Sequence, residues 1–194
     1  MSLGGIRVPL YRLGSAGGAQ ATFTTERALH DVANAGPRPV IPANLVLPGA
    51  EREVTFYYRA AGILSSTATP TYTFSLRLGS NGSTTAAIVL GTAALTTGSG
   101  VTNQAWVAEG EITATTVADA GANSTVRGTG MLWSGGLASP FMYLFNASAS
   151  ATAPTVATVD FSIANYFNLN ITCSASSGSN SIQLLAESVD YLIG

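Results

Sequence analysis

Few side chains in this sequence are able to do chemistry, and their spacing limits what that chemistry could be. His30 is the single histidine, and a carboxylate, Asp31, follows it directly. A general base needs a nucleophile and an orienting group within hydrogen-bond reach. The chain lacks the Gly-x-Ser-x-Gly pattern that presents a serine nucleophile at the end of a strand. We therefore expect a structural or surface role for His30, no catalytic residue and no enzymatic activity.

Two pairs of carboxylates share a spacing of two residues, Glu51 with Glu53 and Glu109 with Glu111. Residues two apart on a β-strand lie on one face, so each pair could meet arginines of a neighbouring strand or, less readily, a cation. A calcium loop would add Asp or Asn at further regular spacings, which neither pair has. The spacing favours cross-strand or intersubunit salt bridges, with metal binding as the alternative. We expect no metal site and no cofactor.

Aromatic residues are the other candidates for binding. Trp106 and Trp133 lie in strand-like runs, where such rings usually fill the core or a subunit contact, although an exposed ring could stack on a sugar. Tyr57 and Tyr58 are consecutive, so on a strand they face opposite ways. We predict that one of them lies in the core and the other on an outer face or subunit boundary.

The elements that must position these residues are β-strands. The clearest run spans residues 72–78, where large apolar residues occupy every second position and Thr, Ser and Arg stand between them. This alternation predicts a strand with one buried face. Pro70 precedes the run, and Gly79 follows it as a turn residue. The predicted buried residues are Tyr72, Phe74, Leu76 and Leu78.

Comparable strand signals recur along the chain, separated by turn residues. They lie at 54–60, 84–90, 104–115, 124–133, 141–145, 156–163, 166–174 and 181–193, with a weak edge strand around Leu95. The last two segments, 166–174 and 181–193, are expected to form a terminal hairpin. A short helix at 24–33 is an open alternative for that segment. About nine or ten short strands with frequent turns are typical of a sandwich. We predict an all-β fold, an antiparallel β-sandwich of jelly-roll type.

Composition narrows the function classes. The chain has 194 residues, of which 46% are hydrophobic and 9% charged, against about 25% charged in an average soluble protein. Such a surface suits a protein largely covered by its own copies or by another shell. All eight basic residues are arginines, and the net charge is −2. Nucleic-acid binding needs a basic stripe, so we do not expect a nucleic-acid partner.

The single cysteine and the short apolar runs give two further expectations. Cys173 cannot form an internal disulfide, which fits assembly in a reducing cytoplasm, and it is predicted to be a buried small hydrophobe. The best apolar run, 86–90, has the length of a strand and not of a membrane span. We expect neither a membrane partner nor a secretory signal.

The first 20 residues differ from the rest. Apolar residues alternate with glycines, and the segment 14–18 resembles a flexible hinge. We predict an extended N-terminal docking arm at 1–20 and a jelly-roll domain at 21–194. A disordered tail is the alternative, although such tails contain fewer large apolar residues. The candidate docking residues are Leu3, Ile6, Arg7, Val8, Leu10, Tyr11 and Arg12.

Several segments together resemble a known family. They are Ile41–Leu45, Pro48–Ala50, Val54–Gly62, Thr69–Gly79, Asn103–Trp106 and Glu109–Thr113. In this order they are similar to segments of small structural proteins of tailed bacteriophages. The resemblance covers roughly residues 38–135 and does not include the arm.

The resemblance implies a fold, a function and a location. Such proteins are jelly rolls that trimerise and decorate the capsid, or form head fibres and spikes. We therefore expect a virion protein, assembled in the host cytoplasm, that forms a homotrimer and binds the major capsid protein or another virion protein through its arm. The alternative is a carbohydrate-binding receptor module of a tail fibre or tail tip. That module would place an exposed Trp or Tyr beside the loops 81–85 or 147–155 and bind a host-surface glycan.

Overall fold

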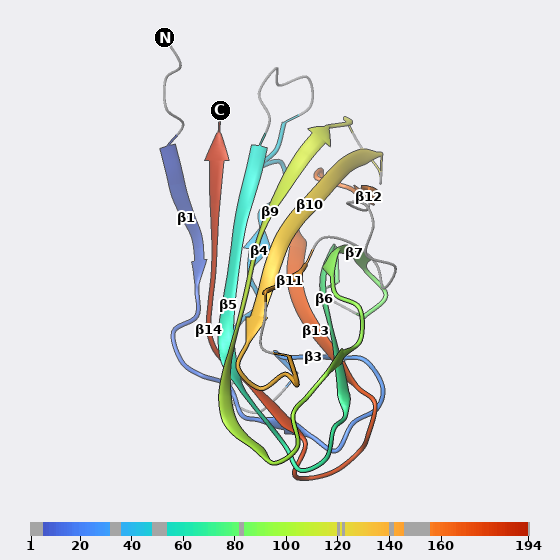
Figure 1. Ribbon diagram of the computed structural model, residues 1–194. Coiled ribbons are helices and arrows are strands. Elements are labelled where there is room, and N and C mark those ends of the chain that lie inside the picture. The colour runs from blue at the N-terminus through green and yellow to red at the C-terminus, as the bar shows by residue number, and fades with distance from the viewer. Residues whose placement is uncertain are drawn as a thin grey trace.

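The computed structural model describes residues 6–31, 36–47, 54–81, 84–119, 121, 123–139, 142–145 and 156–193. These residues form strands and turns without a helix, and hence without a helix that could cross a membrane. The strands make two antiparallel sheets packed face to face (Figure 1). The predicted all-β sandwich is confirmed, and no helix forms in the described residues of 24–33.

The larger sheet, called the large sheet below, carries most of the exposed features. Its strands lie in the order β1 (Ile6–Arg12), β14 (Ser181–Ile193), β5 (Val54–Ser66), β9 (Val101–Thr116), β10 (Ser124–Ser134) and β11 (Met142–Leu144). β12 (Val156–Val159) also pairs with β10, and β2 (Gln20–Ala21) with β14.

The small sheet covers the inner face of the large one. It has the order β3 (Arg27–Ala28), β13 (Asn165–Cys173), β6 (Thr71–Gly79) and β7 (Ala87–Gly91). β4 (Val40–Ile41) pairs with β13, and β8 (Leu95–Thr96) pairs with β6. The two-residue β8 is the weak strand expected around Leu95.

The path of the chain between the sheets is that of a jelly roll. The first and last strands, β1 and β14, are neighbours in the large sheet, and β3 and β13 are neighbours in the small one. The chain crosses between the sheets from β2 to β3, from β4 to β5, from β5 to β6, from β8 to β9, from β12 to β13 and from β13 to β14. Nested crossings of this kind produce the two Greek keys of a jelly roll, with β10, β11 and β12 added at one edge of the large sheet.

The predicted terminal hairpin is wrong. β13 and β14 lie in different sheets, and residues 174–180 carry the chain across the sandwich between them. Alternation within each strand fixes which face is buried, but it does not fix the pairing partner. A link of this length can span the roughly 10 Å between packed sheets.

The core confirms the alternation predicted from the sequence. Tyr72, Phe74, Leu76 and Leu78 of β6 are each at most 1% exposed, and Cys173 is also buried. The predicted core role of Trp106 is confirmed, since its side chain is fully enclosed and its ring centroid lies 5.4 Å from that of Phe74. Such aromatic contacts add to the free energy of burial.

A glycine makes room for this tryptophan. Gly62 of β5 is directly opposite Trp106 of β9. A Cβ atom at Gly62 would lie 1.9 Å from the carbonyl oxygen of Gln183 and 2.6 Å from the Trp106 ring. Only a residue without a side chain allows the indole and the β14 backbone to approach β5 this closely.

β1 is an edge strand of the large sheet. It pairs with β14 from Ile6 opposite Ile193 to Arg12 opposite Ser188, with a register shift between Pro9 and Tyr11. β1 begins, and β14 ends, at the same end of the sandwich (Figure 1). Residues 6–12 of the predicted arm are therefore part of the sheet, while the docking role of the arm stays a prediction.

Candidate functional site

The outer face of the large sheet is divided into rows of side chains. Residues in register on neighbouring antiparallel strands point to the same side of the sheet. The register between β14, β5, β9, β10 and β11 therefore defines each row. One row holds Asp190, Tyr57, Glu111 and Thr129. The next holds Ser188, Arg59, Glu109, Met131 and Leu144. A third holds Ala186, Ala61, Val107, Trp133 and Met142.

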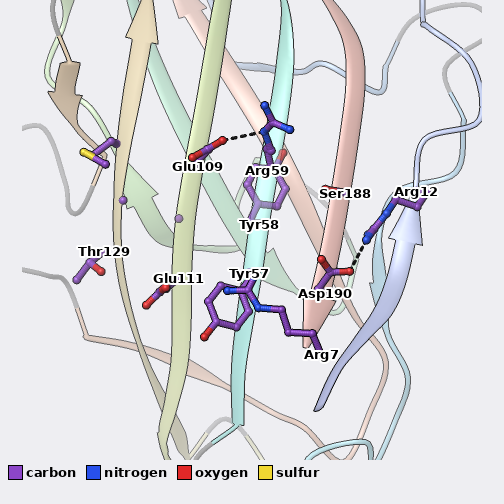
Figure 2. Close-up of a pocket in the computed structure, with 13 residues that line it drawn as sticks. Arg7, Arg12, Tyr57, Tyr58, Arg59, Glu109, Glu111, Thr129, Ser188 and Asp190 are labelled. Carbon is purple, nitrogen blue, oxygen red and sulfur yellow. Dashed lines mark hydrogen bonds and ion pairs between the residues drawn. The ribbon is translucent and has the colours of Figure 1, made fainter. Parts of the chain in front are cut away.

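The first two rows and the β1 arginines enclose a shallow hollow of about 750 Å³ on this face. Figure 2 shows its side chains converging from β1, β14, β5, β9 and β10. Arg7 reaches across β14 and places its guanidinium carbon 3.6 Å from the centroid of the Tyr57 ring. This is a cation–π contact, and it occupies one face of the ring.

Two ion pairs cross the strands of the hollow. Arg12 of β1 contacts Asp190 of β14 at 2.6 Å, and Arg59 of β5 contacts Glu109 of β9 at 2.7 Å. The second pair confirms the cross-strand salt bridge predicted for Glu109. Both pairs are largely exposed, so each contributes at most about 1 kcal/mol to stability.

The other predicted carboxylates are less constrained. Glu111 is opposite Tyr57 and Thr129, and among the described residues it has no ion-pair partner. Glu51 and Glu53 lie outside the described residues. The described part of the chain contains no group of three or more His, Cys, Asp or Glu side chains that could hold a metal ion.

An apolar band borders the hollow. It consists of the third row, Ala186, Ala61, Val107, Trp133 and Met142, together with Met131 and Leu144 of the adjoining row. The four large side chains of β10 and β11 are open to solvent, with exposures of 47% for Met131, 42% for Trp133, 66% for Met142 and 59% for Leu144. Trp133 is therefore not a core residue, and the subunit contact and the ligand platform stay as its predicted roles.

A buried polar cluster lies beneath the face, between the two sheets. His30 Nε2 is 2.7 Å from Glu187 Oε2, and the Tyr58 hydroxyl donates to Glu187 Oε1 at 2.5 Å. The side chains of His30 and Glu187 are at most 1% exposed. The Tyr11 hydroxyl is also buried and lacks a hydrogen-bond partner in the described part of the chain. His30 is thus buried and hydrogen-bonded within the fold, which agrees with the structural role among the two roles expected for it.

The cluster shifts the pKa of its members. Burial lowers the pKa of His30, but the hydrogen bond and the negative charge of Glu187 outweigh burial, and the net pKa is raised above 6.5. Burial, together with Glu187, raises the pKa of Tyr58 well above 10 and that of Tyr11 to about 12. The raised pKa of His30 favours its charged form beside Glu187, and the raised pKa values of the two tyrosines favour their neutral hydroxyls.

The predicted docking residues divide between the two faces of β1. Arg7 and Arg12 are exposed and line the hollow. Tyr11 packs against the core, as does Leu10. Val8 is half-buried, Leu3 lies outside the described residues, and the side chain of Ile6 is not described. The structure thus brings the two arginines together with Tyr57 and buries Tyr58. Of the two consecutive tyrosines, one lies in the core and the other on the outer face, as predicted.

The two loops expected to bind a sugar, 81–85 and 147–155, show fewer features of a binding site among the described residues. A second hollow of about 380 Å³ lies beside residues 80–81 and 85–87, and no tryptophan or tyrosine is among its described lining residues. The loop 147–155 lies outside the described residues. Among the described residues, it is the face of the large sheet that combines aromatic and charged groups.

Comparison with known proteins adds little about function to what the geometry of the site shows. The sequence matches no protein-family model and no curated protein. Among solved structures, the chain is similar to one described as the CBM2 module of Lactobacillus casei BL23 phage J-1 evolved Dit, with 12% identity over 98% of both chains and a TM-score of 0.33. A TM-score this low carries no argument about function.

Proposed function

We propose that this chain is a non-enzymatic structural subunit of a bacteriophage virion. It would be a capsid decoration, head-fibre or spike protein that assembles as a homotrimer in the host cytoplasm. The phage assignment rests on the resemblance of residues 38–135 to small structural proteins of tailed phages. The jelly-roll fold agrees with that resemblance.

The observation that carries the proposal is the open outer face of the large sheet. Four large apolar side chains on β10 and β11 are between 42% and 66% exposed. Contiguous exposed apolar side chains mark protein–protein contacts in soluble proteins. A chain with 9% charged residues also has little charge to repel a partner. Both features favour a protein that works as part of an assembly.

The second element of the proposal is attachment to the capsid through the N-terminal segment. Arg7 and Arg12 lie on the exposed face of the large sheet, Arg7 over the Tyr57 ring and Arg12 paired with Asp190. Guanidinium groups suit contacts with carboxylates of a partner. Tyr11 packs into the core. Attachment through the β1 arginines and the residues before them therefore leaves the strand in place. Many copies of such a contact add up through multivalency.

The experiment that tests this function is the mass of the purified protein by light scattering, followed by binding to purified capsids of the phage that encodes it. We expect a mass of three chains and co-sedimentation with capsids. The variant Arg7→Gln with Arg12→Gln should keep the mass and lose most of the co-sedimentation. A monomer that does not bind capsids would contradict the proposal.

A second candidate function is glycan binding at the hollow. The observation that favours it is Glu111, a carboxylate beside Tyr57 with no ion-pair partner among the described residues. A carboxylate of this kind could accept hydrogen bonds from sugar hydroxyls. Binding on a glycan array that Glu111→Ala abolishes would support this function. A negative array with intact trimers would remove it.

A further inference from the structure

We propose that the guanidinium group of Arg7, which lies over the ring of Tyr57, binds a carboxylate of an acidic partner protein. The inference rests on the capsid attachment proposed above. It goes further in two respects, because it assigns the contact to one arginine of the hollow and states the chemistry of the surface that this arginine binds. The occupant of this part of the hollow is therefore an Asp or Glu side chain of the virion partner.

Arg7 differs from the other two arginines that line the hollow. The guanidinium group of Arg12 already binds the carboxylate of Asp190. That of Arg59 likewise binds Glu109. Among the described residues, Arg7 has neither an ion-pair partner nor a hydrogen-bond acceptor. A guanidinium group carries several N–H donors in a fork that matches a carboxylate. The donors of Arg7 are consequently available to a partner.

The ring of Tyr57 holds this guanidinium group in place. The guanidinium carbon of Arg7 lies 3.6 Å from the ring centroid, and Figure 2 shows the side chain reaching across the sheet to the ring. The attraction is made by the π electrons of the ring and uses no hydrogen-bond donor. A carboxylate binds an arginine through two parallel hydrogen bonds. The contact with Tyr57 therefore orders the guanidinium group and leaves its donors free, and an ordered group loses less entropy on binding.

The charges on the outer face of the large sheet favour an acidic partner. Arg127 of β10 is exposed and is two residues from Thr129 of the hollow, which places it on the same face. The described charges of this face are then four arginines and three carboxylates, namely Arg7, Arg12, Arg59 and Arg127 with Asp190, Glu109 and Glu111. The whole chain, by contrast, has eight arginines and ten carboxylates. This face is therefore more positive than the protein as a whole, and it attracts a partner of negative charge.

The residue types of the hollow favour a protein as the partner. Met131 lines the hollow opposite Glu109 and is 47% exposed. Contacts between proteins are enriched in Met, Tyr and Arg, and the hollow combines Met131 with Tyr57 and Arg7. A protein segment can place a carboxylate on Arg7 and an apolar side chain against Met131. A sugar would cover the same methionine with hydroxyl groups.

Glu111 distinguishes an acidic protein from a sugar. It is directly opposite Tyr57 on β9, and its carboxylate has no ion-pair partner among the described residues. This carboxylate repels an acidic side chain that binds Arg7, whereas it accepts hydrogen bonds from sugar hydroxyls. Removal of its charge should therefore strengthen the binding of an acidic protein and weaken the binding of a sugar.

The test measures the dissociation constant for purified capsids by co-sedimentation, with the full-length wild type and four variants. Arg7→Gln removes the proposed binding group, and Arg7→Lys keeps its charge without the fork of donors. Glu111→Gln removes the opposing charge. Arg127→Gln is the matched control, because it removes the same charge from the same face outside the hollow. Far-UV circular dichroism and the urea midpoint establish that each variant is folded.

We expect Arg7→Gln to weaken capsid binding by about 10-fold or more, since charge-assisted hydrogen bonds are lost. Arg7→Lys should lie between this variant and the wild type, because an ammonium group cannot form two parallel hydrogen bonds. Glu111→Gln should tighten binding by about twofold in about 0.15 M salt.

The control should change binding much less. Arg127 on β10 is four strands away from Arg7 on β1, which is roughly 19 Å. This distance exceeds the Debye length of about 8 Å in about 0.15 M salt, so Arg127→Gln should weaken binding by less than about threefold. Equal losses for Arg7→Gln and Arg127→Gln would overturn the inference, because binding would then follow the charge of the whole face.

Failure of the inference and failure of the proposed function give different results. Capsid binding that Arg7→Gln leaves unchanged would overturn the inference and keep the attachment. A wild type that does not sediment with capsids would overturn the attachment, and calorimetry with poly-L-glutamate would then decide the inference. Binding of this polymer that depends on Arg7 would support the carboxylate site, and the absence of such binding would overturn it.

A sugar polymer with carboxylates, polygalacturonate, tests the class of the partner. Weaker binding of polygalacturonate than of poly-L-glutamate supports an acidic protein. Tighter binding of polygalacturonate, reduced in Glu111→Gln, would overturn that choice and assign the hollow to an acidic sugar.

Discussion

Glu187 is a carboxylate enclosed in the core and held there by side chains from distant parts of the chain. His30 and Tyr58 both bond to it, and the backbone N–H of Leu13 donates to its carbonyl oxygen. Two charges taken out of water are costly unless they stay paired. The contribution of this cluster to the free energy of unfolding can therefore be measured by replacing one of its members.

Replacing Glu187 by Gln should destabilise the fold by about 3 kcal/mol, because it leaves the buried imidazole without its counter-charge. Glu109→Gln is the comparison, since it breaks an exposed pair and should cost less than about 1 kcal/mol. Urea unfolding near pH 6 measures both. Equal costs for the two variants would contradict the buried-pair account.

The same cluster predicts how stability changes with pH. The folded pKa of His30 is raised above 6.5, so its contribution is fully present below pH 6.5 and is lost as the pH rises through the raised value. The free energy of unfolding of the wild type should therefore decline above pH 6.5. In His30→Gln this decline should be absent. A matching slope in both proteins would assign the dependence to another group.

The loss of stability at acid pH has a separate origin, in the ion pair between Glu26 and Arg77. Burial raises the pKa of Glu26, but hydrogen bonds from Arg77 and Asn170 and the charge of Arg77 outweigh it, and the net pKa is below 4.5. The contribution of Glu26 is present above pH 4.5 and is lost as the pH falls through the lowered value. Glu26→Gln should flatten this loss in a urea series from about pH 5 to pH 3.

Gly62 tests the close packing around Trp106. A methyl group there would meet the Gln183 carbonyl oxygen and the indole, so Gly62→Ala should destabilise the fold by about 2 kcal/mol or more. Gly178→Ala is the control, because nothing lies within 4 Å of the added atom. Thermal unfolding of both variants measures the difference, and a stable Gly62→Ala protein would exclude the close contact.

At the scale of elements, alternation in the sequence was sufficient to predict the main strands and their buried faces. Alternation did not predict the structure at a β-bulge or where the chain crosses between the two sheets. Glu187 was missed because the register shift between Leu184 and Ala186 turns it inward, whereas simple alternation from Leu184 places it outward. The terminal hairpin failed because pairing between strands depends on the whole topology. The hollow could not be predicted, since its side chains come from five strands.

The edge strand β1 gives a prediction at this scale. Tyr11 and Leu13 pack on the core, and β1 pairs with β14. Deleting residues 1–13 should lower the free energy of unfolding, because it uncovers Tyr58 and Glu187 and removes a row of backbone hydrogen bonds. Amide exchange along residues 188–193 should accelerate in parallel. The double variant Arg7→Gln with Arg12→Gln, which keeps β1, should leave both measurements close to the wild type.

At the scale of the whole molecule, the protein has few charged residues and an open apolar face. Its assembly should therefore depend little on the salt concentration. Electrostatic contacts between exposed groups weaken as the Debye length falls from about 14 Å at about 0.05 M salt to about 3 Å at about 1 M. A contact through the apolar band has no such dependence. The dissociation constant of the proposed trimer should therefore change less than about threefold between these salt concentrations. Sedimentation at both concentrations measures it. A trimer that falls apart in high salt would place the contact among the arginines and carboxylates of the hollow, and not on Trp133 and Met142.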